Sequence, residues 1–186
     1  GVPLGLVAGY ARGKAEAIIM RIADIFMSFP SIVLILVLVA VLGPSVWSVT
    51  CVIGVLGWTQ FARLIYASVL SVREKDYVES AKAIGAKNGT ILLRYVLPNS
   101  FAPVIISFTF RTAQAIITES SLSFLGLGSA PPTPEWGMMV SDGVDYFNKF
   151  WVAGFPGLAI FTMAVGANFI GDGLRDLLDP KLRTQF

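Results

Sequence analysis

Four polar side chains interrupt an apolar segment in the second half of the sequence. Arg111, Gln114 and Thr118 recur at positions i, i+3 and i+7, so they share one face of a helix, and Glu119 follows directly. Polar side chains inside a membrane-spanning helix usually face the interior of a bundle or a water-filled path. Two interpretations follow: the four residues line a translocation pathway, or they form hydrogen bonds between helices that hold a bundle together.

The residues that enzymes use most often are sparse. The chain has no histidine and a single cysteine, Cys51, which lies inside an apolar block. It therefore lacks the commonest general base and the soft ligands of a transition-metal site. It also contains no G-x-x-x-x-G-K-S/T phosphate-binding loop, and its net charge of +2 is too small to favour nucleic acid as a partner. We expect no catalytic residue, metal site or cofactor on this chain.

The longest polar stretch, Asp76–Pro98, lies between two apolar segments. It is predicted to form two short helices joined by a turn. The first helix is predicted to start with a capping box at Asp76 and Glu79 and to stop at Gly85. A turn at Asn88-Gly89 then leads to the second helix, Thr90–Val96, which ends at Leu97-Pro98. Small side chains on the first helix would let it seat in a groove of another protein. An ordinary connector between two membrane segments is the alternative.

Apolar blocks of membrane-spanning length surround these residues. Of the 186 residues, 55% are hydrophobic and only 14% are charged, and the mean hydropathy is +0.72. Because the apolar residues come in long blocks with almost no charge, we predict an all-α polytopic transmembrane bundle. The predicted spans cover about residues 25–42, 46–66, 99–125 and 150–171. Residues 1–10 are apolar but too short to cross about 30 Å of hydrocarbon, so we expect a fragment that lacks upstream spans.

Shorter signals mark the connections between these blocks. From Ala17 to Phe29, isoleucines and phenylalanines recur on one helical face, which predicts an amphipathic helix at the interface or the frayed start of the next span. Pro30 is expected to kink or start that span. Residues 43–45 favour a tight turn, and residues 126–149, rich in proline and glycine, are predicted as a turn-rich loop.

The basic residues indicate the orientation. Most of them fall in the segments before the first span, in the polar stretch and in the tail, whereas the connection between the last two spans holds only Lys149. Because basic residues accumulate on the cytoplasmic side, we predict that the polar stretch and the C-terminus are cytoplasmic.

The spacing within the polar stretch resembles the signature loop of ABC-importer permeases. That pattern is Glu-Ala-Ala, three residues, Gly, nine residues, Ile, one residue, Leu-Pro. The chain matches it at Glu79, Ala81, Gly85, Leu97 and Pro98, and departs from it at Ser80 and Tyr95. Further segments resemble the second permease subunit of dipeptide, oligopeptide and nickel importers: Ser123–Gly128, Pro131–Pro134, Glu135–Gly137, Gly171–Asp176 and Asp179-Pro180.

The resemblance implies a single permease domain over residues 1–186, similar to type I importers, with a cytoplasmic helix-turn-helix coupling loop at residues 71–98. It implies a prokaryotic inner-membrane subunit that pairs with a homologous permease, two cytoplasmic ATPases that hold ATP and Mg, and an extracytoplasmic substrate-binding protein. The ATPase-coupling residues would be Glu79, Ser80, Ala81, Gly85, Tyr95, Leu97 and Pro98, and the cargo a peptide or nickel. The alternative is a self-contained secondary transporter or channel in which the loop is only a connector.

Overall fold

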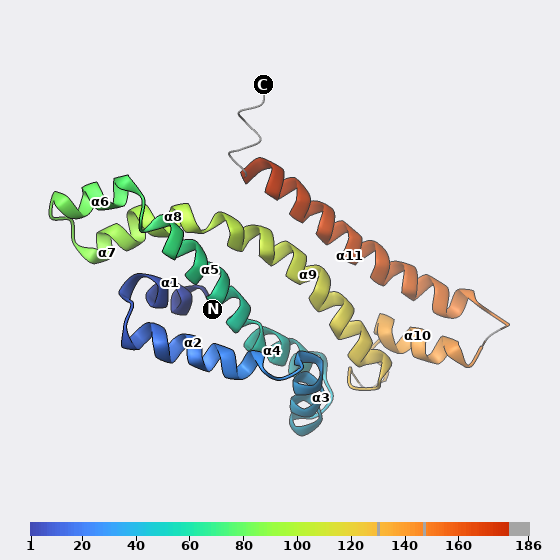
Figure 1. Ribbon diagram of the computed structural model, residues 1–186. Coiled ribbons are helices and arrows are strands. Elements are labelled where there is room, and N and C mark those ends of the chain that lie inside the picture. The colour runs from blue at the N-terminus through green and yellow to red at the C-terminus, as the bar shows by residue number, and fades with distance from the viewer. Residues whose placement is uncertain (130, 147, 179–186) are drawn as a thin grey trace. The chain divides into compact units, whose positions relative to one another are not determined.

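The computed structural model describes residues 1–129, 131–146 and 148–178, and within these ranges the secondary structure is helical without any strand (Figure 1). Asp179-Pro180, which contributed to the resemblance, lies outside the described residues. The chain divides into two compact units. The first combines Gly1–Phe29 with Gly57–Ser107, and the second combines Pro30–Leu56 with the described residues from Phe108 onward.

The first unit contains α1 (Val2–Ala11), α2 (Lys14–Met27), α5 (Trp58–Val72), α6 (Asp76–Ala83), α7 (Asn88–Ile91), the π-helical turn η1 (Leu92–Val96) and α8 (Leu97–Ser100). Helix α1 packs closely along α5 because its glycines leave room for the α5 backbone. A Cβ atom at Gly5 would overlap the carbonyl oxygen of Ala62, and one at Gly9 would lie 2.8 Å from a methyl group of Val69. The amphipathic segment is a helix of its own, α2, and it ends before Pro30.

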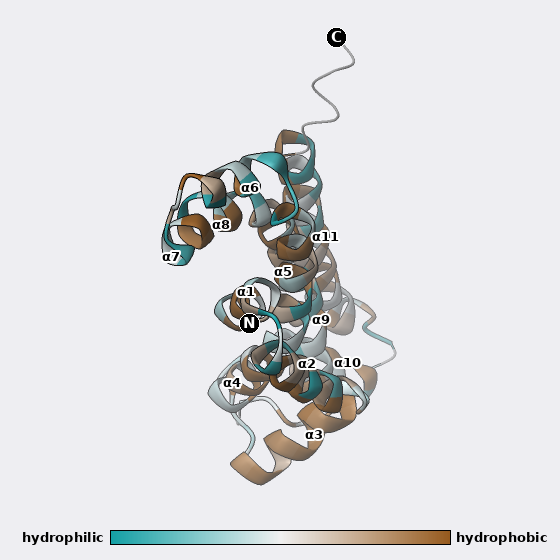
Figure 2. Ribbon diagram, turned by 60° about the vertical axis from the view of Figure 1, so that its left-hand side comes forward, coloured by the Kyte–Doolittle hydropathy of each residue, from teal (hydrophilic) through white to brown (hydrophobic). Residues whose placement is uncertain are grey.

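The second unit contains α3 (Ser31–Leu42), α4 (Val46–Leu56), α10 (Trp136–Val144) and α11 (Trp151–Leu178), together with most of α9 (Ala102–Phe124). Pro30 precedes α3 directly and residues 43–45 separate α3 from α4, as expected from the sequence. Helix α3 is apolar along its whole length (Figure 2). Its side chains Ile35 and Val39 are fully or almost fully buried in a core that they share with residues of α4 and of the end of α9. Those residues are Val49 and Val52 of α4 and Leu122 of α9.

The prediction of a turn-rich loop over residues 126–149 is wrong for its central part, which forms α10. The sequence suggested turns because glycine usually interrupts a helix. Here the glycines serve close packing instead. A Cβ atom at Gly137 would overlap the carbonyl oxygen of Ser120, and one at Gly143 would lie 2.6 Å from the backbone nitrogen of Ala153. Helix α10 therefore packs against α9 and α11 through its glycine positions.

Two helical stretches are long and apolar enough to cross a membrane by length and composition, Val46–Val72 and Trp151–Leu178. Both extend past the predicted span ends at residues 66 and 171. The pairs Lys14–Met27 with Ser31–Leu42 and Asn88–Ser100 with Ala102–Phe124 meet the same criteria together, each across a short break. Counting each pair as one span brings the number to four among the described residues.

Candidate functional site

The polar stretch folds back onto the first unit through its own apolar side chains. Val78, Ile91 and Val96 are fully inaccessible to solvent and Ala81 is 4% exposed. They share one core with Leu6 of α1 and with Ile65 and Val69 of α5. A side-chain hydrogen bond adds to this attachment: the Tyr10 hydroxyl of α1 donates to Asn88 Oδ1 (3.1 Å). Just ahead of the stretch, Arg73 Nη1 donates to the Gly9 carbonyl (3.2 Å). The stretch is thus a packed part of the unit.

Helix α6 ends at the glycine that the sequence indicated. Gly85 has a φ of +81°, and its N–H donates to the Lys82 carbonyl while the Ala86 N–H donates to the Ala81 carbonyl. These two bonds form a complete Schellman motif, which satisfies carbonyls that the helix end would leave free.

The predicted capping box at Asp76 is wrong. Lys75 occupies the N-cap position, Asp76 is the first helical residue, and no side chain caps the helix. Asp76 and Glu79 both lie in the first helical turn. There their negative charges interact favourably with the helix dipole, without a capping hydrogen bond.

The second half of the stretch also differs from its prediction. Asn88-Gly89 is the beginning of α7 and not a turn, and the helical path continues through η1 and α8 to Ser100, past Leu97-Pro98. The π-type bond from the Leu97 N–H to the Leu92 carbonyl widens the helix just before Pro98. This local change of register accommodates a residue that lacks an N–H and would clash inside a regular α-helix.

The predicted coupling residues divide between the surface and the core. Glu79, Ser80, Gly85 and Pro98 are exposed, whereas Ala81 is buried and Tyr95 and Leu97 are partly buried against the same core; the stretch includes the polar helix α6 (Figure 2). Ala81 therefore provides close contact within the chain itself.

Sequence reasoning missed two exposed apolar side chains on α6 and at its C-cap. Ile84 is 82% exposed and Tyr77 is 42% exposed. Together with Ser80 they recur at i, i+3 and i+7, next to the buried face that carries Val78 and Ala81. We use the name α6 outer face for the exposed surface formed by Tyr77, Ser80 and Ile84, together with the exposed Glu79 farther around the helix. The available signal was this second apolar pair in an otherwise polar segment.

The four polar residues of the apolar segment all lie in α9, within the second unit. Arg111 and Gln114 are exposed, and Thr118 and Glu119 are half-buried. The helical spacing keeps Arg111, Gln114 and Thr118 on one face, as predicted. The structure therefore leaves a polar stripe on α9 that ends near Glu119.

A carboxylate anchors the loop that follows α9. Glu135, just ahead of α10, accepts a hydrogen bond from the Ser123 hydroxyl (2.5 Å) and another from the Ser129 N–H (2.8 Å). Burial alone would raise the pKa of Glu135, but these hydrogen bonds outweigh it and hold the pKa below its ordinary value. Glu135 thereby ties the start of α10 to the end of α9.

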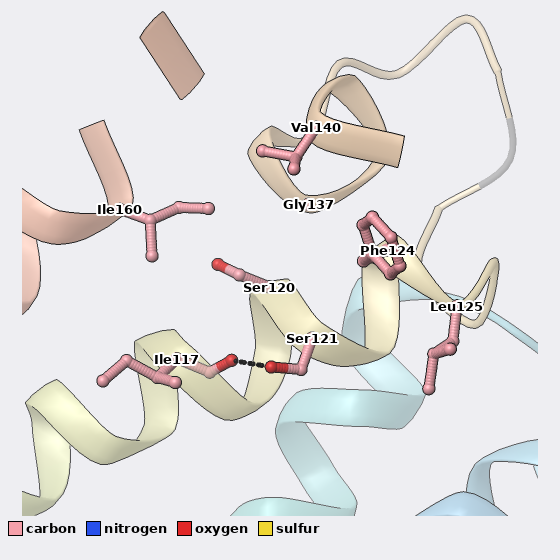
Figure 3. A pocket seen from close by; sticks show the side chains of 8 residues that line it. All are labelled: Ile117, Ser120, Ser121, Phe124, Leu125, Gly137, Val140 and Ile160. Atoms are coloured by element: carbon pink, nitrogen blue, oxygen red, sulfur yellow. Dashed lines mark hydrogen bonds between the residues drawn. The ribbon is translucent and has the colours of Figure 1, made fainter. Parts of the chain in front are cut away.

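A cavity of about 380 Å³ lies beside this anchor, between α9, α10 and α11 (Figure 3). Its lining is mostly apolar and consists of Ile117, Ser120, Ser121, Phe124, Leu125, Gly137, Val140 and Ile160. The Ser121 hydroxyl donates a hydrogen bond to the carbonyl of Ile117 (2.7 Å). The cavity thus offers apolar contacts and few free hydrogen-bonding groups.

Comparison with known proteins places these features in a family. Residues 1–184 match the model of the binding-protein-dependent transport system inner membrane component. The chain is 44% identical over 185 residues to a dipeptide transport system permease protein of Alkalihalophilus pseudofirmus, covering 99% of this chain and 61% of that protein. It is 44% identical to a glutathione transport system permease protein of Pectobacterium atrosepticum (99% of this chain, 62% of that protein) and 41% identical to a putative peptide transport system permease protein of Brucella suis (100% and 62%).

The chain spans about three fifths of the length of these relatives. The match nevertheless covers almost every residue of this chain, including the polar stretch, α9 and the Glu135 anchor. The chain therefore belongs to the family of binding-protein-dependent transport system inner membrane components.

Proposed function

We propose that this chain, paired with a homologous permease subunit, forms the translocation pathway of an ATP-driven importer for short peptides. Two cytoplasmic ATPase subunits supply the energy and hold ATP and Mg, and an extracytoplasmic binding protein delivers the cargo. Support for the cargo comes from relatives named for the transport of dipeptides, glutathione and peptides. Nickel, the other cargo implied by the resemblance, has no support from these names.

The packing of the polar stretch carries the coupling part of this proposal. Four of its side chains are buried in the core that holds α5, so a force applied to α6 reaches α5 through close contacts. The exposed Glu79 and Ile84 offer a charge and an apolar anchor to a partner. The ATPase would hold the α6 outer face, and its closure on ATP would bias the membrane helices between inward-facing and outward-facing states.

The polar stripe of α9 supports the pathway part. We propose that Arg111, Gln114, Thr118 and Glu119 line the route of the peptide, with Arg111 meeting a carboxylate and the amide and hydroxyl groups meeting the peptide backbone. Exposure of Arg111 and Gln114 within an apolar helix favours this role. The proposed orientation, with the α6 outer face and the C-terminus in the cytoplasm, rests on the distribution of basic residues.

The test is peptide uptake by vesicles that contain the permease pair, the ATPases and the binding protein. Glu79→Lys should reduce uptake about tenfold or more, because it places a repulsive charge where a basic partner residue is expected. ATP hydrolysis should continue, uncoupled from transport. Asp176→Lys, the same charge change at an exposed position of α11, serves as the control and should transport normally.

Two outcomes would overturn the proposal. Full uptake by the Glu79→Lys variant would exclude the α6 outer face as the coupling surface. Uptake at the normal rate in vesicles without any ATPase would favour the self-contained transporter or channel, and would remove the importer mechanism altogether.

A further inference from the structure

Helix α2 exposes an unusual combination of side chains. Ile18, Ile22 and Ile25 are 60%, 42% and 55% exposed, and they follow one another at helical spacing along one side. The exposed cations Lys14 and Arg21 lie on the same side, because positions 14, 18, 21 and 25 recur at i, i+4, i+7 and i+11. We call these five residues the α2 basic-apolar face.

The acidic residues of α2 are engaged elsewhere. Asp24 forms an ion pair with Arg63 of α5, and Glu16 accepts a hydrogen bond from the Tyr66 hydroxyl of α5. The fully buried Ala23 marks the side on which α2 meets its own unit. Both carboxylates of α2 are therefore bound to α5, whereas its isoleucines face away from the unit, the reverse of the usual arrangement in a soluble protein.

Lys14 and Arg21 have no acidic counterpart on this face. The ion pairs among the described residues of the first unit involve Arg12, Arg63 and Arg73, and neither Lys14 nor Arg21 takes part in one. The face therefore combines an apolar strip with two uncompensated positive charges. A protein partner would have to supply carboxylates within an apolar surface, whereas a membrane that contains anionic lipids offers phosphates directly beside acyl chains.

We propose that the α2 basic-apolar face binds anionic phospholipid. The phosphate groups would contact Lys14 and Arg21, whose long side chains reach toward the headgroups, while acyl chains pack along Ile18, Ile22 and Ile25. The site would hold this helix at a fixed depth in the membrane interface. It is independent of the coupling role of α6, and α2 contains none of the residues assigned to coupling.

The structure supplies a reporter for this site. Trp58 stacks edge-on against Phe26 of α2 with ring centroids 6.2 Å apart. In a permease that retains Trp58 as its one tryptophan, with Trp47, Trp136 and Trp151 among those changed to phenylalanine, Trp58 fluorescence reports lipid near α2. The probes are brominated phosphatidylglycerol and brominated phosphatidylcholine, titrated into bilayer nanodiscs of unlabelled phosphatidylcholine that contain the permease. Brominated acyl chains quench a tryptophan that they contact.

We expect brominated phosphatidylglycerol to quench Trp58 at a markedly lower mole fraction than brominated phosphatidylcholine. The double change Lys14→Gln with Arg21→Gln should abolish this preference. Each lost cation should lower the affinity for phosphatidylglycerol, relative to that for phosphatidylcholine, about fivefold. Lys82→Gln with Lys87→Gln, which removes two exposed cations from the polar stretch, should leave it intact. Ile18→Ser with Ile25→Ser should weaken quenching by both lipids alike. The Trp58 emission maximum and the elution volume in detergent verify that each variant is folded.

Two results would overturn the inference. A phosphatidylglycerol preference that persists in the Lys14→Gln, Arg21→Gln variant would place the anionic lipid elsewhere. An absence of quenching by either lipid would mean that a protein surface, such as the second permease subunit, covers this face.

Discussion

Ile84 provides the sharpest test of how the polar stretch works. Its side chain is 82% exposed although it is apolar and lies outside every predicted span. The change Ile84→Ala removes three carbon atoms, each worth about 0.8 kcal/mol when buried. If docking of the ATPase buries the exposed 82% of this side chain, the variant loses about 2 kcal/mol of binding free energy, or about thirtyfold in the dissociation constant.

Ile91 is the matched control, because it is the same residue type in the same stretch with the opposite environment. It is 0% exposed and belongs to the core shared with α5. Ile91→Ala should therefore cost about 2–5 kcal/mol of folding stability through the cavity that it leaves. Ile84→Ala should leave the thermal unfolding temperature unchanged, because the folded chain already exposes most of this side chain to solvent.

The assay measures binding of the purified ATPase subunit to the permease in nanodiscs, with thermal unfolding of each variant recorded in parallel. Weak ATPase binding with intact stability for Ile84→Ala, and reduced stability for Ile91→Ala, would support the division into an outer face and a core. ATPase affinity within twofold of wild type for Ile84→Ala would refute the docking role of the α6 outer face.

Two further predictions concern the second unit. Gly137→Ala should lower its stability by about 1–3 kcal/mol, because the new Cβ atom overlaps the carbonyl oxygen of Ser120. At Gly154 a Cβ atom would meet nothing within 4 Å, so Gly154→Ala should be neutral or stabilise by up to about 1 kcal/mol. Equal unfolding temperatures of the Gly137→Ala and Gly154→Ala variants would contradict the close packing of Gly137. The lowered pKa of Glu135 means that its stabilising effect is complete above the ordinary glutamate pKa and is lost as the pH falls through the lower folded value. Glu135→Gln should remove this part of the acid dependence, and identical plots of unfolding temperature against pH for wild type and variant would exclude the Ser123 and Ser129 hydrogen bonds as its source.

Much of the fold could be predicted because its signals are local. The apolar blocks, the helix boundary at Pro30 and the stop at Gly85 depend on residues within one or two helical turns. The same holds for the stripe of Arg111, Gln114 and Thr118, which requires only the period of a helix. Family membership was also accessible, because the spacing from Glu79 to Pro98 is a property of the chain order alone.

The errors arose where the outcome depends on distant residues. Gly137 resembles a turn residue until the carbonyl of Ser120 is seen next to it. Propensities predict a helix end at Pro98, and they carry no information about the widened turn that accommodates this proline.

The polar stretch shows the same division between local and distant information. Sequence alone predicts short helices between two apolar segments, since glycine signals and apolar spacing are local properties. The buried side of α6 depends instead on tertiary packing, which turns Val78 and Ala81 into the core and leaves Ile84 exposed. The physical reason is that two neighbouring faces of α6 carry apolar residues, and packing against α5 buries just one of them.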